Sequence, residues 1–209
     1  MHILCPLCHG YETRSYADGK YSLCYNCKGL FIPSDALPDV KTEYSRYLKH
    51  HSTVDDDGYL QFIKPIIEYI TNLITIEHRC LDFGSGQYST ISQILRKKGY
   101  SVEQYDPFFY NHPQLLQEKY DFIVACEVIE HFHHPFESFE SLHSCLQDKG
   151  EIIGMTHIYD GNEEQFKRWY YRRDITHTFI YQRDTFEWIT NQWNYSKLHI
   201  DGRLFVLTK

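Results

Sequence analysis

The first residues that could do chemistry are an acid and two glycines within Cys80–Gly86. This stretch reads Cys-Leu-Asp-Phe-Gly-Ser-Gly, so an apolar run ends at Asp82 and the turn Gly84-Ser85-Gly86 follows at once. Glycines let the backbone approach a ligand, and a helix that starts after such a turn offers unpaired N–H groups. A buried strand, a glycine turn and a helix form the nucleotide or cofactor site of many open α/β sheets. Alone, the motif leaves the ligand open.

A second acid, Asp106, lies 20 residues beyond Gly86, directly after the run Tyr100–Tyr105. At the tip of a second strand, a carboxylate at this distance can accept both hydroxyls of a ribose. An ordinary turn aspartate before Pro107 is the alternative. The glycine turn upstream favours ribose binding.

Four of the seven cysteines form two paired knuckles, Cys5-Pro-Leu-Cys8 and Cys24-Tyr-Asn-Cys27, with 15 residues between the pairs. This spacing is typical of a Cys₄ zinc site. Disulfides or a redox CxxC are the alternatives, but a reducing cytosol disfavours disulfides and a redox motif needs no second copy. With all four positions filled by cysteine, the predicted zinc is structural.

Between the knuckles, two short alternating runs flank an Asp18-Gly19 turn and predict a hairpin, so that the whole resembles a zinc ribbon. Such a small polar unit cannot fold on apolar contacts alone, and bound metal must stabilise it. We therefore expect a chelator to unfold residues 1–30 while the rest of the chain survives.

The elements that must position the acids and glycines alternate between strand and helix. Buried strands are predicted at residues 80–83, 100–105, 121–126 and 151–156. Helices are predicted at 41–50, 59–74, 87–98 and 135–146. The alternation indicates a parallel sheet.

Two prolines at positions 33 and 38 indicate a domain boundary. We expect a zinc ribbon over residues 1–35, a linker with N-terminal helices over 36–76, and the α/β domain over 77–209. The acidic run at 55–57 predicts a helix N-cap cluster, with a lid over the cofactor as the alternative.

The composition of the chain limits the classes of partner that it is expected to bind. The net charge of −7, with 13 histidines counted as neutral, disfavours a nucleic-acid partner, although a local basic patch could still bind one. No stretch approaches the roughly 18–20 apolar residues of a membrane helix. The N-terminus lacks the pattern of a signal peptide. We expect a soluble, cytoplasmic protein without a membrane partner.

Three motifs together resemble the class I S-adenosylmethionine-dependent methyltransferases: Leu81–Gly86, Asp106 and Asp121–His131. The chain is further similar to bacterial members with an N-terminal zinc ribbon. The resemblance implies a Rossmann-like α/β fold with a seven-stranded, mostly parallel sheet and an antiparallel C-terminal strand. A predicted hairpin around Asp201-Gly202 agrees with this. A dinucleotide dehydrogenase would more often show a third glycine where Ser89 stands.

The resemblance implies that S-adenosylmethionine contacts Asp82, Gly84, Ser85, Gly86, Asp106, Pro107, Phe108, Cys126 and Glu127. The first four surround the methionine part, and Asp106 holds the ribose. Pro107 and Phe108 flank the adenine. Cys126 and Glu127 face the sulfonium.

Glu127, Glu130 and His131 stand at i, i+3 and i+4, so a helical turn would place them on one face. Similar turns in quinone-type O-methyltransferases suggest His131 as a catalytic base, or a divalent metal site there. Alternatively, His131 merely satisfies a backbone group.

The segment 167–177 contains four basic residues and three adjacent aromatic residues. In the superfamily this region usually builds the acceptor pocket, which makes His177 and Tyr171 candidate acceptor-side residues. An aromatic-rich helix with its charges in water is the alternative.

The sequence thus predicts a methyltransferase that uses S-adenosylmethionine and a structural zinc ion, and whose acceptor is a small molecule. An RNA or protein methyltransferase is one alternative, because the ribbon and the basic aromatic segment could hold a macromolecule. A non-catalytic S-adenosylmethionine-binding protein is the other.

Overall fold

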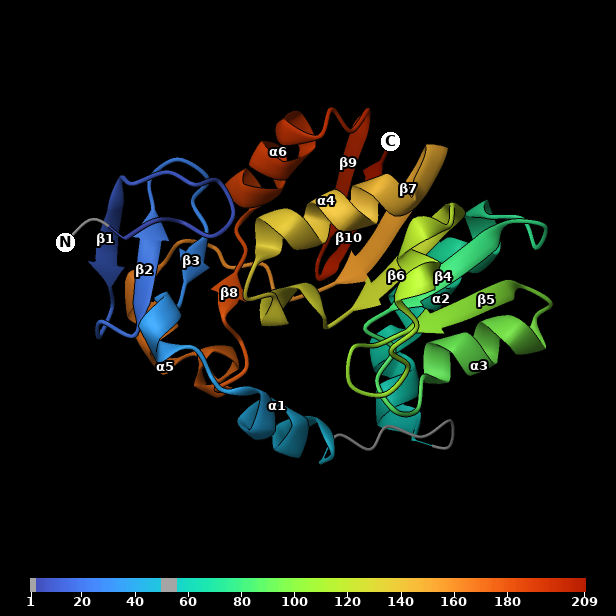
Figure 1. The fold of residues 1–209 in the computed structure, drawn as a ribbon, viewed down its shortest axis with the longest axis horizontal. Helices are drawn as coiled ribbons and strands as arrows, with labels where there is room; N and C mark the ends of the chain where they lie inside the picture. Colours follow the sequence, from blue (N-terminus) through green and yellow to red (C-terminus); the bar gives the residue numbers. More distant parts are fainter. Residues whose placement is uncertain (1–2, 50–55) are drawn as a thin grey trace.

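The computed structural model describes residues 3–49 and 56–209 and contains two β-sheets. The larger has the order β5-β4-β6-β7-β10-β9 and the smaller the order β1-β2-β3-β8 (Figure 1). The strands of the larger sheet are β4 (Arg79–Phe83), β5 (Ser101–Tyr105), β6 (Tyr120–Cys126), β7 (Leu146–Met155), β9 (Lys197–Asp201) and β10 (Leu204–Thr208). Those of the smaller sheet are β1 (Thr13–Tyr16), β2 (Tyr21–Cys24), β3 (Leu30–Phe31) and β8 (Phe179–Ile180). The helices are α1 (Val40–Tyr47), α2 (Asp57–Leu73), α3 (Thr90–Lys97), α4 (Pro135–Cys145), α5 (Glu163–Arg168) and α6 (Arg183–Gln192).

The larger sheet confirms the predicted α/β fold class. Strands β5, β4, β6 and β7 are parallel, and β10 enters antiparallel between β7 and β9 as the predicted hairpin. In the described residues the sheet has six strands, not the expected seven. Between β5 and β6 the chain forms the 3₁₀ turn Pro113–Gln117. Pro107 and Pro113 lack the N–H that a ladder needs, which disfavours a strand there.

Helices cover both faces of the larger sheet because its strands are apolar on both sides. Leu81 and Ile123 pack with α4 and α6 in one buried cluster. Their neighbours Cys80 and Phe122 point the other way and pack with α2 and α3. Fully buried parallel strands of this kind explain the continuous apolar runs in the sequence.

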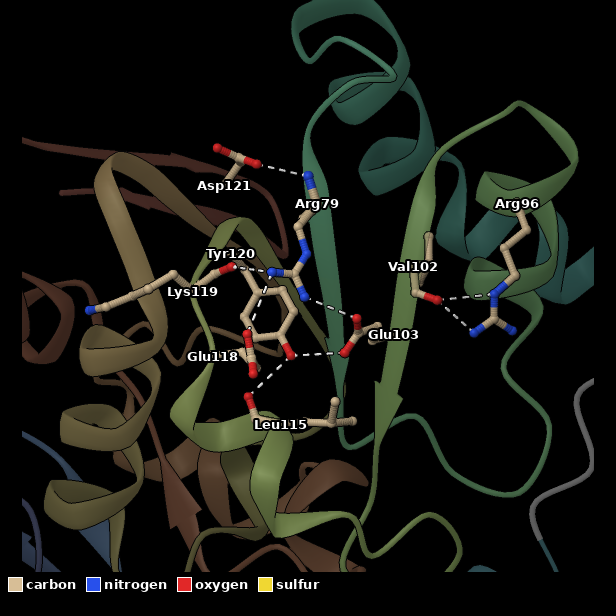
Figure 2. Close-up of polar contacts among 9 residues, drawn as sticks. All are labelled: Arg79, Arg96, Val102, Glu103, Leu115, Glu118, Lys119, Tyr120 and Asp121. Atoms are coloured by element: carbon tan, nitrogen blue, oxygen red, sulfur yellow. Dashed lines mark hydrogen bonds and ion pairs between the residues drawn. The ribbon is translucent and has the colours of Figure 1, made fainter.

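A polar network sets the register at the starting ends of β4, β5 and β6 (Figure 2). The Arg79 N–H donates to Asp121 Oδ2 at 2.8 Å, and its guanidinium lies 3.0 Å from Glu103. The Tyr120 hydroxyl lies 3.1 Å from both Glu103 Oε2 and the Leu115 carbonyl oxygen. The network also holds the 3₁₀ turn that replaces the expected strand, and the carboxyl ends of the three strands meet at the opposite edge.

The hairpin predicted for the ribbon is present, with β1 and β2 on either side of the Asp18-Gly19 turn. The ribbon does not stand alone. Strand β3 pairs with β8, and Cys5 and Cys27 belong to the same buried cluster as α4 and α6. A Cβ added at Gly29 would lie 2.3 Å from the Phe179 ring, so a glycine is needed where the two parts meet.

Of the acidic run 55–57, for which a lid was the alternative, Asp55 lies outside the described residues. Asp56 caps α2, because its side chain accepts a hydrogen bond from the Tyr59 N–H at 3.1 Å. Across 3–49 and 56–209, no helix is both long and apolar enough to cross a membrane.

Candidate functional site

The predicted glycine turn follows β4 and folds back onto the end of β5. The Gly84 and Ser85 N–H groups donate to the Tyr105 carbonyl at 2.8 and 3.2 Å, and the Gly86 N–H donates to Asp106 Oδ2 at 2.9 Å. Both glycines have positive φ, 71° at Gly84 and 63° at Gly86. A Cβ at Gly84 would also lie 2.6 Å from Val128. The turn therefore requires glycine at both positions.

Asp106 joins the two strand ends. Besides the bond to Gly86, its Oδ1 accepts from the Phe108 and Phe109 N–H groups at 2.8 and 3.1 Å. A carboxylate has about four acceptor positions, so these three bonds leave one for a ligand. Pro107, predicted beside the adenine, lies in the same short turn, closed by the Asp106–Tyr110 bridge.

Asp82 is buried, and its Oδ2 accepts from the Ser89 hydroxyl and, at 2.6 Å, from the Ser92 hydroxyl. Burial raises the pKa of Asp82. Ser89 is also the N-cap of α3, accepting from the Ser92 N–H at 3.0 Å. From the sequence, Ser89 is notable only because it stands where a dinucleotide-binding motif would have a third glycine. Its capping role was readable from its place before a helical pattern.

Glu127 begins the loop after β6, with φ 51°. The expected helical turn through Glu127, Glu130 and His131 is wrong, because only Ile129–His131 is helical and forms a 3₁₀ turn. The Glu127 Oε1 atom is buried without a hydrogen-bond partner, and Arg203 Nη1 lies 3.9 Å away, too far to donate. Burial raises the pKa of Glu127 to about 7. The preceding Cys126 has its thiol pKa raised by burial, which disfavours a reactive thiolate.

Glu130 is fully buried at the centre of a second group of polar side chains. Its Oε1 accepts from the Tyr171 hydroxyl at 2.5 Å, and its Oε2 accepts from the Thr156 hydroxyl at 3.1 Å. Its backbone carbonyl accepts from the Thr178 N–H at 2.8 Å. Burial raises the pKa of the Glu130 carboxyl to about 7.

The two candidate histidines adjoin Glu130. His131 Nδ1 lies 2.9 Å from the Thr176 carbonyl oxygen, and His177 Nδ1 lies 2.7 Å from that of Tyr171. Because a carbonyl only accepts, each Nδ1 must carry the hydrogen and each Nε2 keeps a lone pair. Burial lowers the pKa of both rings, to about 4 for His177, so both are neutral at pH 7.

The structure thus brings together the three residues predicted as catalytic. The ring centroids of His131 and His177 lie 4.9 Å apart, and those of Tyr171 and His177 lie 4.0 Å apart. One ligand atom each from Glu130, His131 and His177 lie within 4.8 Å of one another. A histidine that donates its other N–H to a carbonyl is arranged as metal-binding histidines are. This trio could therefore hold a divalent cation.

Helix α1 connects this histidine cluster with the turn after β5. The Tyr47 ring centroid lies 5.3 Å from that of Phe108 and 5.5 Å from that of His131. Arg46 on the same helix pairs with Asp174 at 2.6 Å. Figure 1 shows α1 beside the edge where β4, β5 and β6 end. Helix α1 therefore contacts both the turn that follows β5 and the histidine cluster.

A hollow of about 410 Å³ is lined by His157, Ile158, Tyr159, Asp160, Gln165, Phe166, Arg168 and Trp169, and none of His131, Tyr171 and His177 belongs to its lining. The His157 ring lies 4.5 Å from that of Tyr171, and its Nε2 contacts Arg203. Sequence reasoning missed His157 and Arg203. They come from the end of β7 and from the last hairpin, and no local pattern relates them.

The four cysteines of the knuckles are brought together as predicted. Cys5 and Cys27 have their sulfurs 3.6 Å apart, and those of Cys8 and Cys24 are 3.4 Å apart. Zinc–sulfur bonds of about 2.3 Å require sulfurs about 3.8 Å apart in a tetrahedron. All four are free thiols within 4.8 Å of one another, so they fit a Cys₄ metal.

Comparison with other proteins gives three findings. Residues 40–200 match the profile of a family described as a methyltransferase domain. No curated protein matches the sequence. Several solved structures share the fold.

One of these is 1,6-didemethyltoxoflavin-N1-methyltransferase from Burkholderia thailandensis, solved with 1,6-didemethyltoxoflavin and S-adenosylhomocysteine. It is 12% identical over 95% of this chain and 99% of its own, with a TM-score of 0.56. An O-methyltransferase family protein from the same organism is 11% identical over 79% of this chain, with a TM-score of 0.53; this chain spans only 61% of its length. The PH0226 protein of Pyrococcus horikoshii OT3 is 12% identical over 79% of this chain and 97% of its own, with a TM-score of 0.51.

Proposed function

The chain belongs to the class I S-adenosylmethionine-dependent methyltransferases, and from this premise we propose that it methylates a small molecule bound beside His131, Tyr171 and His177. The observation that carries the proposal is the pair of neutral histidines with free Nε2 lone pairs beside the buried Glu130. Such a pair can accept the proton that an acceptor hydroxyl or amine loses on methylation.

The residues of the cofactor side fit S-adenosylmethionine. When bound, this cofactor supplies a methyl group on a positively charged sulfur. The buried, unpartnered Oε1 of Glu127 would face a cationic part of the cofactor. Asp106 has one acceptor position left for a ribose hydroxyl, and the Gly84–Gly86 backbone leaves room for close approach. Asp82 would not contact the cofactor directly. It would hold α3 in place behind the turn.

On the acceptor side, His131 would accept the proton at Nε2. Its Nδ1–H is fixed on the Thr176 carbonyl, which sets the ring orientation. The neighbouring Glu130 carboxylate favours the charged imidazolium, because the two charges are opposite. His177 and Tyr171 would orient the acceptor. Much of the rate can come from this positioning alone.

A divalent cation on Glu130, His131 and His177 is the alternative that the same geometry supports. Such an ion would lower the pKa of an acceptor hydroxyl by binding its oxygen. Metal analysis of the purified protein separates the two arrangements. If His131 acts as a base without a bound cation, the analysis should find one zinc ion per chain and no second metal ion. A second bound ion that is lost on His131→Ala replacement, while zinc is kept, supports the cation.

A small-molecule acceptor is favoured by the size of the hollow beside Tyr171. About 410 Å³ lies within the usual range for small-ligand sites. Trp169 and Tyr159, whose rings are stacked at 27°, offer a flat apolar wall. A macromolecular acceptor has one observation in its favour, a second hollow of about 460 Å³ on α1 that includes Lys41, Arg46 and Lys49. RNA binding that weakens steeply with salt would support that alternative.

The test is transfer of a labelled methyl group from S-adenosylmethionine to metabolites of a cell extract, with mass spectrometry to identify products that gain one methyl. His131→Ala and His177→Ala should lower transfer about 100-fold or more, while S-adenosylhomocysteine affinity stays unchanged. The control is His78→Ala, an exposed histidine before β4. Full transfer by both site variants would refute the assignment, and absence of any transfer with intact cofactor binding would favour a non-catalytic binding protein.

A further inference from the structure

The zinc ribbon contacts the chain segment that presents the acceptor-side residues. Strand β8 is the fourth strand of the ribbon sheet, with Leu30 opposite Ile180. The Ile32 N–H donates to the Thr178 carbonyl at 2.9 Å. One step earlier in the chain, the buried Tyr21 hydroxyl donates to the His177 carbonyl at 2.8 Å. These three contacts, at His177, Thr178 and Ile180, fix the backbone at and after His177.

The turn of the same hairpin holds the residue after Tyr171. Asp18 accepts two bonds from Arg172 Nη2, at 2.5 and 2.6 Å, and Lys20 Nζ donates to the Arg172 carbonyl at 3.1 Å. The Arg172 side chain is only 9% exposed, so this ion pair is shielded from water on one side. The peptide between Tyr171 and Arg172 carries the carbonyl that receives the His177 Nδ1–H. Asp18 therefore pins the peptide that fixes the His177 tautomer.

The cofactor turn has no such dependence. Asp82 is bonded to Ser89 and Ser92, and Asp106 is bonded to Gly86, Phe108 and Phe109. All these partners lie within residues 82–109. The two halves of the site are thus supported by different parts of the chain.

From these contacts we propose that the zinc ribbon is a positioning device for the acceptor side, and that Tyr21 and Asp18 are its positioning residues. This rests on the proposed function of His177 and Tyr171. Cys24 ends β2 only three residues after Tyr21, so the Cys₄ centre fixes the hairpin from which both contacts are made. Catalytic geometry tolerates errors of only about 0.5 Å, which is why a contact outside the site can set its activity. Loss of the metal, by chelation or thiol oxidation, then disables acceptor positioning while cofactor binding persists.

The test compares Tyr21→Phe and Asp18→Asn with the control Glu163→Gln in the full, zinc-loaded chain. Glu163 also forms an ion pair with the hairpin, with Arg14 at 2.9 Å, but it lies outside the segment 171–180. Three measurements are made: S-adenosylhomocysteine affinity, amide hydrogen exchange at Thr176, His177 and Thr178, and the ¹⁵N signals of the His177 ring, which report its tautomer.

Tyr21→Phe and Asp18→Asn should speed exchange at these amides about fivefold, the effect of one lost hydrogen bond, and should mix the two His177 tautomers. S-adenosylhomocysteine affinity should stay within about twofold of the wild type, and Glu163→Gln should match the wild type throughout. If Tyr21→Phe fails to fold, the surface change Asp18→Asn decides. Wild-type exchange and ring signals in Asp18→Asn would overturn the proposal. Failure of the wild type to bind S-adenosylhomocysteine would instead refute the proposed function, since the ring and exchange measurements do not require cofactor.

Discussion

At the scale of single residues, the Glu127 carboxylate indicates that a cationic ligand binds beside it. Its buried Oε1 lacks a hydrogen bond, and its pKa lies near 7 because burial disfavours the charged form. A native protein rarely leaves a buried carboxylate oxygen without a hydrogen bond, and the Arg203 guanidinium, 3.9 Å away, does not supply one. A cationic ligand at this position would remove the penalty.

Glu127 should stabilise the cofactor-free protein at low pH, and this contribution should be lost as pH rises from about 4.5 to about 7, whereas the lowered pKa values of His131 and His177 act in the opposite direction. The folded protein then holds a proton on Glu127 that the unfolded chain, with an ordinary pKa near 4.5, has lost. Because a positive charge favours ionised Glu127, affinity for S-adenosylmethionine relative to S-adenosylhomocysteine should rise over the same range. Denaturant unfolding and calorimetry measure the two effects.

Glu127→Gln is the matched variant for this prediction, since it keeps the shape and removes the titration. The unfolding free energy of the wild type minus that of the variant should fall as pH rises over this range, because Glu130 and the histidines titrate in both proteins and only Glu127 differs. The affinity of this variant for S-adenosylmethionine relative to S-adenosylhomocysteine should not change with pH. An unchanged rise in the variant would show that Glu127 does not face the sulfonium.

Among elements, α1 is the one whose role the sequence did not suggest. The helix itself was predicted, but its place depends on aromatic contacts from two distant loops, Tyr44 with Phe109 at 5.8 Å and Tyr47 with both Phe108 and His131. It therefore covers the cofactor side and the acceptor side together.

Replacing Tyr47 with Ala should weaken S-adenosylhomocysteine binding about three- to tenfold, because each aromatic pair contributes roughly 0.5–1.5 kcal/mol. Calorimetry on the purified protein measures this. Val40→Ala, on the same helix but with a side chain 68% exposed, should bind as the wild type does. Equal affinities for all three proteins would mean that α1 does not cover the cofactor.

Some of these elements can be predicted from the sequence, whereas others depend on contacts with distant parts of the chain. Strands β4 and β6 and helix α4 were predicted because their apolar patterns are local and long. The residue spacing after β6 predicts a helical turn at Glu127. This prediction is wrong because spacing alone cannot show that the residue adopts a positive φ. The two-residue strand β8 has no pattern of its own and exists only because β3 lies beside it. Likewise, Glu130, His131 and His177 were each named from sequence, but their convergence depends on the tertiary fold.

At the scale of the molecule, the ribbon and the catalytic part share a buried core. Cys5 and Cys27 pack in the same cluster as Phe139 and Phe179. This changes the expected effect of zinc removal. The expectation that residues 1–30 unfold by themselves treats the ribbon as separable, whereas its fourth strand belongs to the catalytic part.

We expect a chelator to increase hydrogen exchange in β3 and β8 together, and at residues 176–178, while amides of β4 and β6 keep their protection. The physical reason is that β8 loses its ladder partner when the thiolates are no longer held together. Mass-spectrometric exchange with and without chelator measures this, and readdition of zinc should restore protection. Faster exchange confined to residues 3–32 would show instead that the ribbon unfolds independently.

The pairing of β3 with β8 also bears on how the protein is made. A ribosome completes the two knuckles well before it reaches Phe179 and Ile180, so the first 30 residues emerge with one edge of their sheet unpaired. During that interval the thiols are accessible to metal and to oxidants. The acceptor side thus depends on a segment that must find a strand synthesised about 150 residues earlier, and folding of this region should be slow for its size.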